Sequence, residues 1–456
     1  MSINRDILRL ALPSILANIT VPLVGMVDIA VAGHLDANAA TMIGGVAIGT
    51  MLFDLLYWNF GFLRIGTGGL AAQAYGAGDR EACARILFRS LLLSVAIALF
   101  LIAVQWVFVK AAFLVVDCTP EVRALASRYF FIRIWAAPAT LSLMALKGWF
   151  IGMQDSVSAM ICDVTVNVGN MLMSVVLAIG LTVGKVTLIP ALGFSGIAAG
   201  TVAAQWTGLA TAAVILAVRY RKDTLSHIRI SAFRTIFKDG ETRRFFVMNS
   251  DLFVRSLCFI AIYIGFTVIS ARYGDTLLAT SSILMKILMI FSYFTDGFAY
   301  AGEALTGRFI GAGDKVRLRA TIRGTFAWSM GIALMFIGIY HWGGDFLLRL
   351  MTSDVTVIGA AKKYMAWLLL MPVVGCAAFT WDGIYIGATA SRKMRDSMLW
   401  AVASFVAVYA AGTLLIKVLP GGESETMPLH VLMAAYFAHL LARTIYLTRN
   451  YRQSIL

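Results

Sequence analysis

Long apolar segments separated by short polar stretches fill the whole chain. An α-helix rises 1.5 Å per residue, so about 20 apolar residues are needed to cross a hydrocarbon core of about 30 Å. The pattern predicts an all-α polytopic membrane protein with twelve transmembrane helices. We place them at 8–33, 41–73, 85–114, 127–151, 156–184, 190–218, 245–271, 276–310, 318–345, 358–388, 396–418 and 427–448.

Two short motifs recur at one spacing and indicate an internal duplication. A Gly-Ala-Gly-Asp turn at 76–79 ends the second segment, and the same turn at 311–314 ends the eighth, 235 positions later. Residues 148–152, with glycine at both ends, are matched at the same spacing by 383–387. The repeat is therefore six helices plus six. Because six is even, we expect two six-helix lobes related by a pseudo-two-fold axis along the membrane normal, a design typical of transporters.

The charged residues predict topology and not a nucleic-acid site. Only 14% of residues are charged and the net charge is +14, but the basic residues gather in alternate loops, as the positive-inside rule describes. The predicted organisation is an N-terminal lobe at 1–218, a basic linker at 219–244 and a C-terminal lobe at 245–456. We expect a multi-pass protein of the plasma (inner) membrane, with both termini and the linker in the cytoplasm. We expect no nucleic-acid partner.

The residues and motifs of the sequence disfavour several other classes of protein function. The five cysteines are scattered without CxxC spacing, and the five histidines are isolated from one another, so neither a metal cluster nor an intramembrane enzyme is expected. No GxxxxGK[ST] phosphate loop is present, and the N-terminus lacks the features of a cleaved signal peptide. We expect no cofactor, no enzyme activity and a monomer in the lipid bilayer.

Asp28 is the clearest candidate for function. It lies about four-fifths of the way along the first segment, with no cation within a turn of its own helix. A carboxylate inside a membrane span is costly, so it is by default a functional candidate. Such an acid can take up and release a proton. The alternative is an Asp held permanently by hydrogen bonds from neighbouring helices.

The fifth segment carries a polar stripe of Asp163, Asn167, Asn170 and Ser174, spaced i, i+4, i+7 and i+11. This spacing places all four on one helix face. Amide and carboxylate oxygens there suit a cation's oxygen shell or a hydrogen-bonded proton relay. Interhelical hydrogen bonding, which Asn and Ser commonly supply in membranes, is the structural alternative.

The second half has its own polar set. Asp251 and Arg255 lie one turn apart, a spacing at which they can pair directly and serve structure alone. Asp296 and Glu303 share one face of the eighth segment, and two acids facing a cavity would attract organic cations. Weaker candidates are Asp54, Arg64 and Asp382.

These residues together resemble the multidrug and toxic compound extrusion (MATE) family of cation-coupled efflux transporters, and within it the DNA-damage-inducible protein F branch. The resemblance covers nearly the whole chain. It is carried by Leu12-Pro13-Ser14, Val27-Asp28, Gly33-His34-Leu35, Phe62-Leu63-Arg64, residues 66–74, 296–300, 303–305 and Gly307, and by Asn249-Ser250-Asp251 with Arg255.

The resemblance implies two lobes around a central cavity, with a cation site in the N-terminal lobe. Asp28 matches the first-helix acid tied to coupling, and Asn170 matches a fifth-helix Asn of that site. The family often has an acid one turn later, where this chain has Ser174. Without that negative charge, Na⁺ binding at Asp28 and Asn170 is less favoured, and proton exchange is left to Asp28 nearly alone. Asp163, two turns away on the same stripe, could compensate for the missing charge.

We therefore predict an antiporter coupled to a cation, H⁺ more readily than Na⁺, that exports small amphipathic, cationic organic compounds by alternating access. The alternative is a flippase or exporter of a lipid-linked or bile-salt-like amphiphile. A passive channel fits the two-lobed design less well than alternating access does.

Overall fold

The computed structural model describes residues 2–35, 39–116, 118–183, 186–221, 240–352, 354–418 and 426–456. Within these ranges twelve helices are long and apolar enough to cross a membrane, which confirms the predicted polytopic helical fold. The predicted topology also depends on five basic residues that lie outside the described ranges: Lys185, Lys222, Arg229, Arg234 and Lys238.

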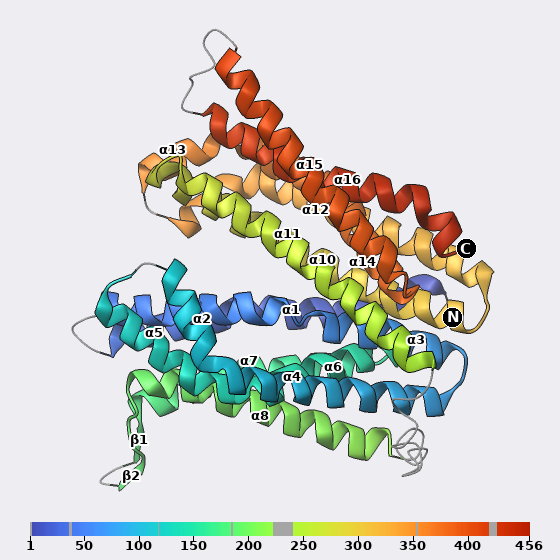
Figure 1. The fold of residues 1–456 in the computed structure, drawn as a ribbon, viewed down its shortest axis with the longest axis horizontal. Helices are drawn as coiled ribbons and strands as arrows, with labels where there is room; N and C mark the ends of the chain where they lie inside the picture. The colour runs from blue at the N-terminus through green and yellow to red at the C-terminus, as the bar shows by residue number, and fades with distance from the viewer. Residues whose placement is uncertain are drawn as a thin grey trace. The chain divides into compact units, whose positions relative to one another are not determined.

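The chain forms two compact units, and the first comprises Leu16–Arg243. Figure 1 shows its helices in blue to green. Its elements begin with α1, of which only the part from Leu16 belongs to this unit. They are α1 (Ile3–His34), α2 (Ala39–Trp58), α3 (Phe62–Gly76), α4 (Arg80–Val115), α5 (Pro120–Arg133), the 3₁₀ turn η1 (Ile134–Ala136), α6 (Ala137–Gly152), α7 (Ser156–Ile179), the antiparallel strands β1 (Leu181–Val183) and β2 (Val186–Ile189), and α8 (Phe194–Arg219).

The second unit comprises Arg244–Leu456 together with Met1–Ile15. The start of α1 packs here: a Cβ on Gly324 would lie 2.9 Å from Ile7 Cδ1. The predicted lobe boundaries at 218 and 245 stay predictions. The remaining helices are α10 (Gly240–Ala271), α11 (Asp275–Gly311), α12 (Lys315–Met351), α13 (Val355–Lys362), α14 (Met365–Gly387), α15 (Ser391–Val418) and α16 (Met427–Ser454).

Three predicted segments correspond to more than one observed element, and the one at 127–151 falls on α5, η1 and α6. The segment at 41–73 is divided between α2 and α3, and the one at 358–388 between α13 and α14. The segment at 127–151 begins earlier, at Pro120, because the Thr119 hydroxyl accepts a hydrogen bond from the Val122 N–H at 3.4 Å and proline suits the first helical turn. The short β1–β2 hairpin was not predicted.

The core of the second unit draws on every helix from α10 to α16. Phe291 of α11 and Phe336 of α12 are buried there with ring centroids 5.6 Å apart. Large apolar side chains also lie exposed, such as Phe100 and Trp106 on α4, which are 63% and 62% exposed. Outward apolar surface of this kind suits contact with lipid.

The duplication is visible in helix packing. A Cβ on Gly148 of α6 would overlap the carbonyl oxygen of Arg64 in α3, and a Cβ on Gly383 of α14 would overlap that of Ala299 in α11. Both members of the first pair are 235 positions from their counterparts in the second. Small residues allow helix backbones to approach this closely. Each unit therefore contains the same helix crossing, built from matched residues.

The matched Gly-Ala-Gly-Asp turns also share one geometry. Gly78 and Gly313 have φ of 73° and 70°, a left-handed conformation that glycine adopts without strain. Asp79 and Asp314 then accept hydrogen bonds from the backbone N–H three residues later, at 2.8 and 2.9 Å. The turns end one helix and cap the next, as their composition predicts.

Gly383→Ala should destabilise the protein by about 1 to 3 kcal/mol, because the new methyl group forces α11 and α14 apart. The matched control is Gly331→Ala in α12, where a Cβ meets nothing within 4 Å. Alanine there should leave stability unchanged or raise it slightly, since it favours helix more than glycine does. Thermal unfolding of the purified proteins in detergent measures both. Equal melting temperatures for the two variants would contradict the proposed packing role.

Candidate functional site

Asp28 lies buried in the first unit, with 6% of its surface exposed. Two polar groups interact with its carboxyl: the Ser174 hydroxyl of α7 through hydrogen bonding, and the Arg133 guanidinium of α5 electrostatically. Its Oδ1 is buried and has no hydrogen-bond partner among the described residues. Leaving an ionised oxygen in this state costs more than the about 1 to 3 kcal/mol of a neutral group. Proton binding would remove that charge, so the geometry suits an acid that exchanges a proton.

Asn170 and Ser174, two members of the predicted stripe, form one hydrogen-bonded network. The Ser174 hydroxyl donates to Asn170 Oδ1 at 3.1 Å and to the Ile197 carbonyl at 3.3 Å. Asn170 Nδ2 donates to Thr201 Oγ1 at 3.0 Å. All three side chains are buried. The stripe therefore connects α7 to α8 beside Asp28, through a threonine that the sequence did not single out.

The other two stripe residues have separate partners. Asn167 Nδ2 donates to Thr20 Oγ1 of α1 at 2.6 Å. Asp163 forms an ion pair with Lys147 Nζ of α6 at 2.6 Å. The predicted helix face exists, but its Asp163 end carries a paired charge. Whether Asp163 compensates for Ser174 stays a prediction, and its contact with Lys147 favours the structural alternative.

Arg133 is a charged residue of this site that sequence reasoning missed. Its Nη1 donates to the Tyr129 hydroxyl at 3.2 Å, and its guanidinium lies 4.7 Å from the centre of the Phe53 ring. Asp28 and Asp54 both act on it electrostatically. The signal was available, because a cation inside an apolar span is as costly as an acid.

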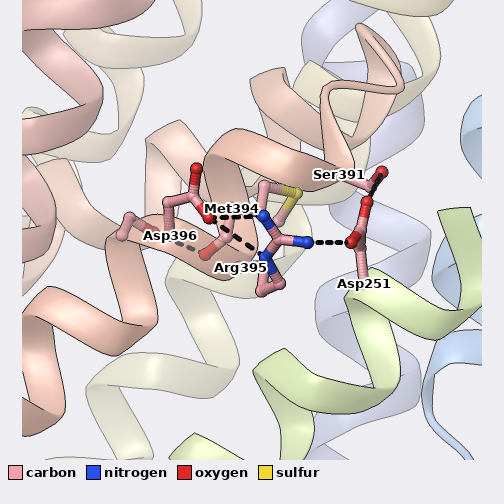
Figure 2. Close-up of polar contacts among 6 residues, drawn as sticks. Asp251, Ser391, Met394, Arg395 and Asp396 are labelled. Atoms are coloured by element: carbon pink, nitrogen blue, oxygen red, sulfur yellow. Dashed lines mark hydrogen bonds and ion pairs between the residues drawn. The ribbon is translucent and has the colours of Figure 1, made fainter.

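The predicted direct pairing of Asp251 with Arg255 is wrong. Asp251 of α10 accepts hydrogen bonds from Arg395 Nη1 at 2.7 Å and from Ser391 Oγ at 2.9 Å, both of α15 (Figure 2). Arg395 also contacts Asp396, so one guanidinium lies between two carboxylates (Figure 2). The spacing of one turn permits a pair along α10, but groups on neighbouring helices offer better geometry. This cluster connects the first turns of α15 to α10.

Arg255 instead donates to Asp382 Oδ2 of α14 at 2.7 Å. Arg443 Nη2 of α16 donates to the same oxygen. Arg443 is fully buried, and its Nε and Nη1 have no hydrogen-bond partner among the described residues. We call these three residues the Asp382 triad. It joins α10, α14 and α16, and its two cations share one carboxylate.

The acids predicted on α11 share that helix but differ in burial. Glu303 is fully buried and Asp296 is partly buried. The Glu303 backbone lies against Gly387 of α14, where a Cβ would overlap its carbonyl oxygen. Their role in binding substrate stays a prediction, as does that of Arg64. Among the described residues, no three His, Cys, Asp or Glu side chains gather as metal ligands would.

The chain is similar to known proteins over most of its length. The MatE family model matches residues 13–176 and 252–413, one match in each half of the chain. DNA damage-inducible protein F of Escherichia coli K12 is 35% identical over 433 residues, covering 95% of this chain and 90% of that protein. A probable multidrug resistance protein NorM of Photorhabdus laumondii is 25% identical over 399 residues, covering 86% and 83%.

A solved structure has the same fold. A MOP superfamily transporter from Pyrococcus furiosus matches with a TM-score of 0.81 at 16% identity, covering all of this chain and 96% of the other. The family match in both halves and the similarity to the Escherichia coli protein over almost the whole length lead to one assignment. The chain is a multi-pass membrane protein that belongs to the MATE family.

Proposed function

We propose that this protein is a proton-coupled antiporter that exports small amphipathic organic cations by alternating access. We place it in the plasma membrane with both termini in the cytoplasm. The observation that carries the proposal is the buried, unpartnered Oδ1 of Asp28 beside Ser174. The relative named as a probable multidrug resistance protein supports the export of drug-like compounds.

Proton exchange fits the Asp28 site better than Na⁺ binding does. A proton needs one oxygen, whereas a hard metal cation takes a shell of several. Ser174 supplies a neutral hydroxyl, and Asn170 Oδ1 already accepts a hydrogen bond from it. The buried Asp28 Oδ1, which has no hydrogen-bond partner among the described residues, is a single ligand atom, and one oxygen is all that a proton needs.

Coupling follows if proton and substrate favour different states of the protein. A ligand shifts a conformational equilibrium only by its difference in affinity for the two states. Protonation of Asp28 would stabilise one state, and the cationic substrate would stabilise the other, so each ligand would promote release of its counterpart.

The test is efflux of a fluorescent organic cation from proteoliposomes, with a pH gradient or a sodium gradient imposed alone. The proposal predicts efflux against the substrate gradient under the pH gradient and none under sodium. Protein-free vesicles correct for passive leakage of the dye. Transport driven by sodium alone would overturn the proposed coupling ion, and flux that neither gradient drives would overturn antiport.

A further inference from the structure

Lys286 is a cation far inside a membrane-spanning helix of the second unit. It lies within the candidate span Thr276–Gly311. Helix α11 begins at Asp275, so eleven residues, or about 16 Å at 1.5 Å per residue, separate Lys286 from the start of the helix. Its side chain is exposed, whereas residues 284–285 and 287–288 on either side are buried. Within the described part of the chain, no ion pair or hydrogen bond engages its ammonium group.

The neighbouring helix α12 shows that this exposed charge lies at the depth of the lipid. The Tyr340 hydroxyl of α12 donates a hydrogen bond to the Ile287 carbonyl at 2.8 Å, so the two helices are level there. Between Tyr340 and the end of α12, Trp342 and Phe346 are 86% and 69% exposed, and apolar surface of this kind suits contact with lipid. A lysine that faced lipid at this depth would be costly, and such residues face water instead. The exposed face of α11 at Lys286 therefore meets water.

Lys286 belongs to a stripe of polar and aromatic residues along this face of α11. The members have the spacing i, i+4, i+7, i+11, i+14 and i+18, which keeps them within about 40° of one line along the helix. Two of them are exposed and four are partly buried. One cation and one acid share the stripe, ten residues or about 15 Å apart along the axis. The stripe comprises Ser282, Lys286, Met289, Tyr293, Asp296 and Tyr300.

We propose that Lys286 binds a carboxylate group of the transported compound, so that the substrates are zwitterions: amphipathic molecules that carry a carboxylate as well as their cationic group. This inference rests on the proposed export function. The ammonium group of Lys286 repels a compound that carries positive charge alone, whereas a carboxylate on the same molecule neutralises that ammonium charge. A lysine ammonium has three N–H donors, and those of Lys286 are free to bind such an anion.

The rest of the stripe fits the other parts of such a molecule. The ring of Tyr293 offers an aromatic face to an apolar body. Asp296 lies beyond Tyr293 as seen from Lys286, and its carboxylate attracts a cationic group. A compound that lies along α11 with its carboxylate at Lys286 would therefore have its cationic end toward Asp296. None of the residues of the Asp28 site takes part in this contact, so a Lys286 variant tests it without altering the proposed proton site.

The test is binding of two matched dyes to the purified protein in detergent, followed by fluorescence. The first is a dimethylaminostyryl-pyridinium dye with a hexanoic acid arm on the ring nitrogen, which is a zwitterion, and the second is its methyl ester, which is a cation only. The wild type should bind the acid about tenfold or more tightly than the ester, because a charge-assisted hydrogen bond forms only with the acid. Lys286→Gln should weaken binding of the acid about tenfold and leave binding of the ester intact, which also shows that the variant is folded.

Three further variants define the cause. Lys286→Arg keeps the charge and should keep the preference for the acid, whereas Lys286→Met should lose it and provides a second neutral variant if Lys286→Gln does not fold. Lys363→Gln is the matched control, because Lys363 is an exposed lysine of the same unit at the end of α13. It should keep the wild-type preference, which excludes a general effect of the protein's net charge of +14.

The inference is overturned if the wild type binds the two dyes with equal affinity, or if the folded neutral variants keep the preference for the acid. It is also overturned if Lys363→Gln loses the preference to the same extent as Lys286→Gln. Failure of the proposed function has a different appearance, because it shows as absence of pH-driven efflux from proteoliposomes by the unmodified protein. The binding preference is measured without any gradient, so the two failures are distinguishable.

Discussion

Asp28→Asn is expected to abolish efflux driven by a pH gradient, lowering the initial rate at least about a hundredfold if Asp28 alone carries the coupled proton. Asparagine keeps the size of the side chain and occupies the same buried place, but it cannot bind and release a proton at ordinary pH. Exchange of labelled for unlabelled substrate, which needs no net proton movement, should continue. The two assays on the same proteoliposomes separate loss of coupling from loss of folding or binding.

The matched control is Asp163→Asn in the same unit. Asp163 pairs with Lys147 at 2.6 Å, and both side chains are partly exposed. We expect this variant to keep pH-driven efflux within a few-fold of the wild type, because partly exposed ion pairs contribute little. Equal pH-driven efflux by Asp28→Asn and the wild type would contradict the role given to Asp28. Loss of coupling in Asp163→Asn alone would move the proton site to that acid.

Asp382→Asn is expected to lower the free energy of unfolding by about 3 to 5 kcal/mol, because it leaves two guanidinium groups without their shared carboxylate. Arg443 is fully buried and can reach no solvent in its place. The measurement is thermal unfolding in detergent, followed by fluorescence and by loss of the monodisperse peak in size-exclusion chromatography.

Two further variants isolate the cause. Asp345→Asn removes an acid whose side chain is 49% exposed and pairs with Lys362, so stability should hardly change. Arg443→Met added to Asp382→Asn should recover part of the lost stability, because it removes the buried charge that the single variant leaves unpaired. If the double variant is no more stable than Asp382→Asn, burial of an uncompensated charge is not the reason for the loss.

The helices and their duplication were predictable because both depend on local pattern. Apolar length predicts a span, which the structure confirms, and the repeated glycines at 148 and 383 indicate the duplication; the structure shows that both lie at matched helix crossings. The candidate site was predictable in part. Asp28, Asn170 and Ser174 stand out as polar groups in apolar segments, and the structure brings them together.

The choice of charged partners was not predictable, because it depends on helices far apart in the sequence. Asp251 and Arg255 have the spacing of a pair, yet Asp251 binds Arg395, 144 positions away. Arg133 and Arg443 lie within apolar segments, but the acids that they interact with lie on other helices, so the sequence does not indicate their partners. Thr201 left no signal, since a hydroxyl among small residues in α8 is typical of ordinary helix packing.

The most direct test of the central claim is proton release on substrate binding, measured in weakly buffered detergent solution with a pH indicator. If substrate and proton favour opposite states through Asp28, adding an organic cation to the wild-type protein should release protons into the solution. Asp28→Asn should bind the same compound and release none. Equal proton release by both proteins, or binding by the wild type without any release, would contradict the account.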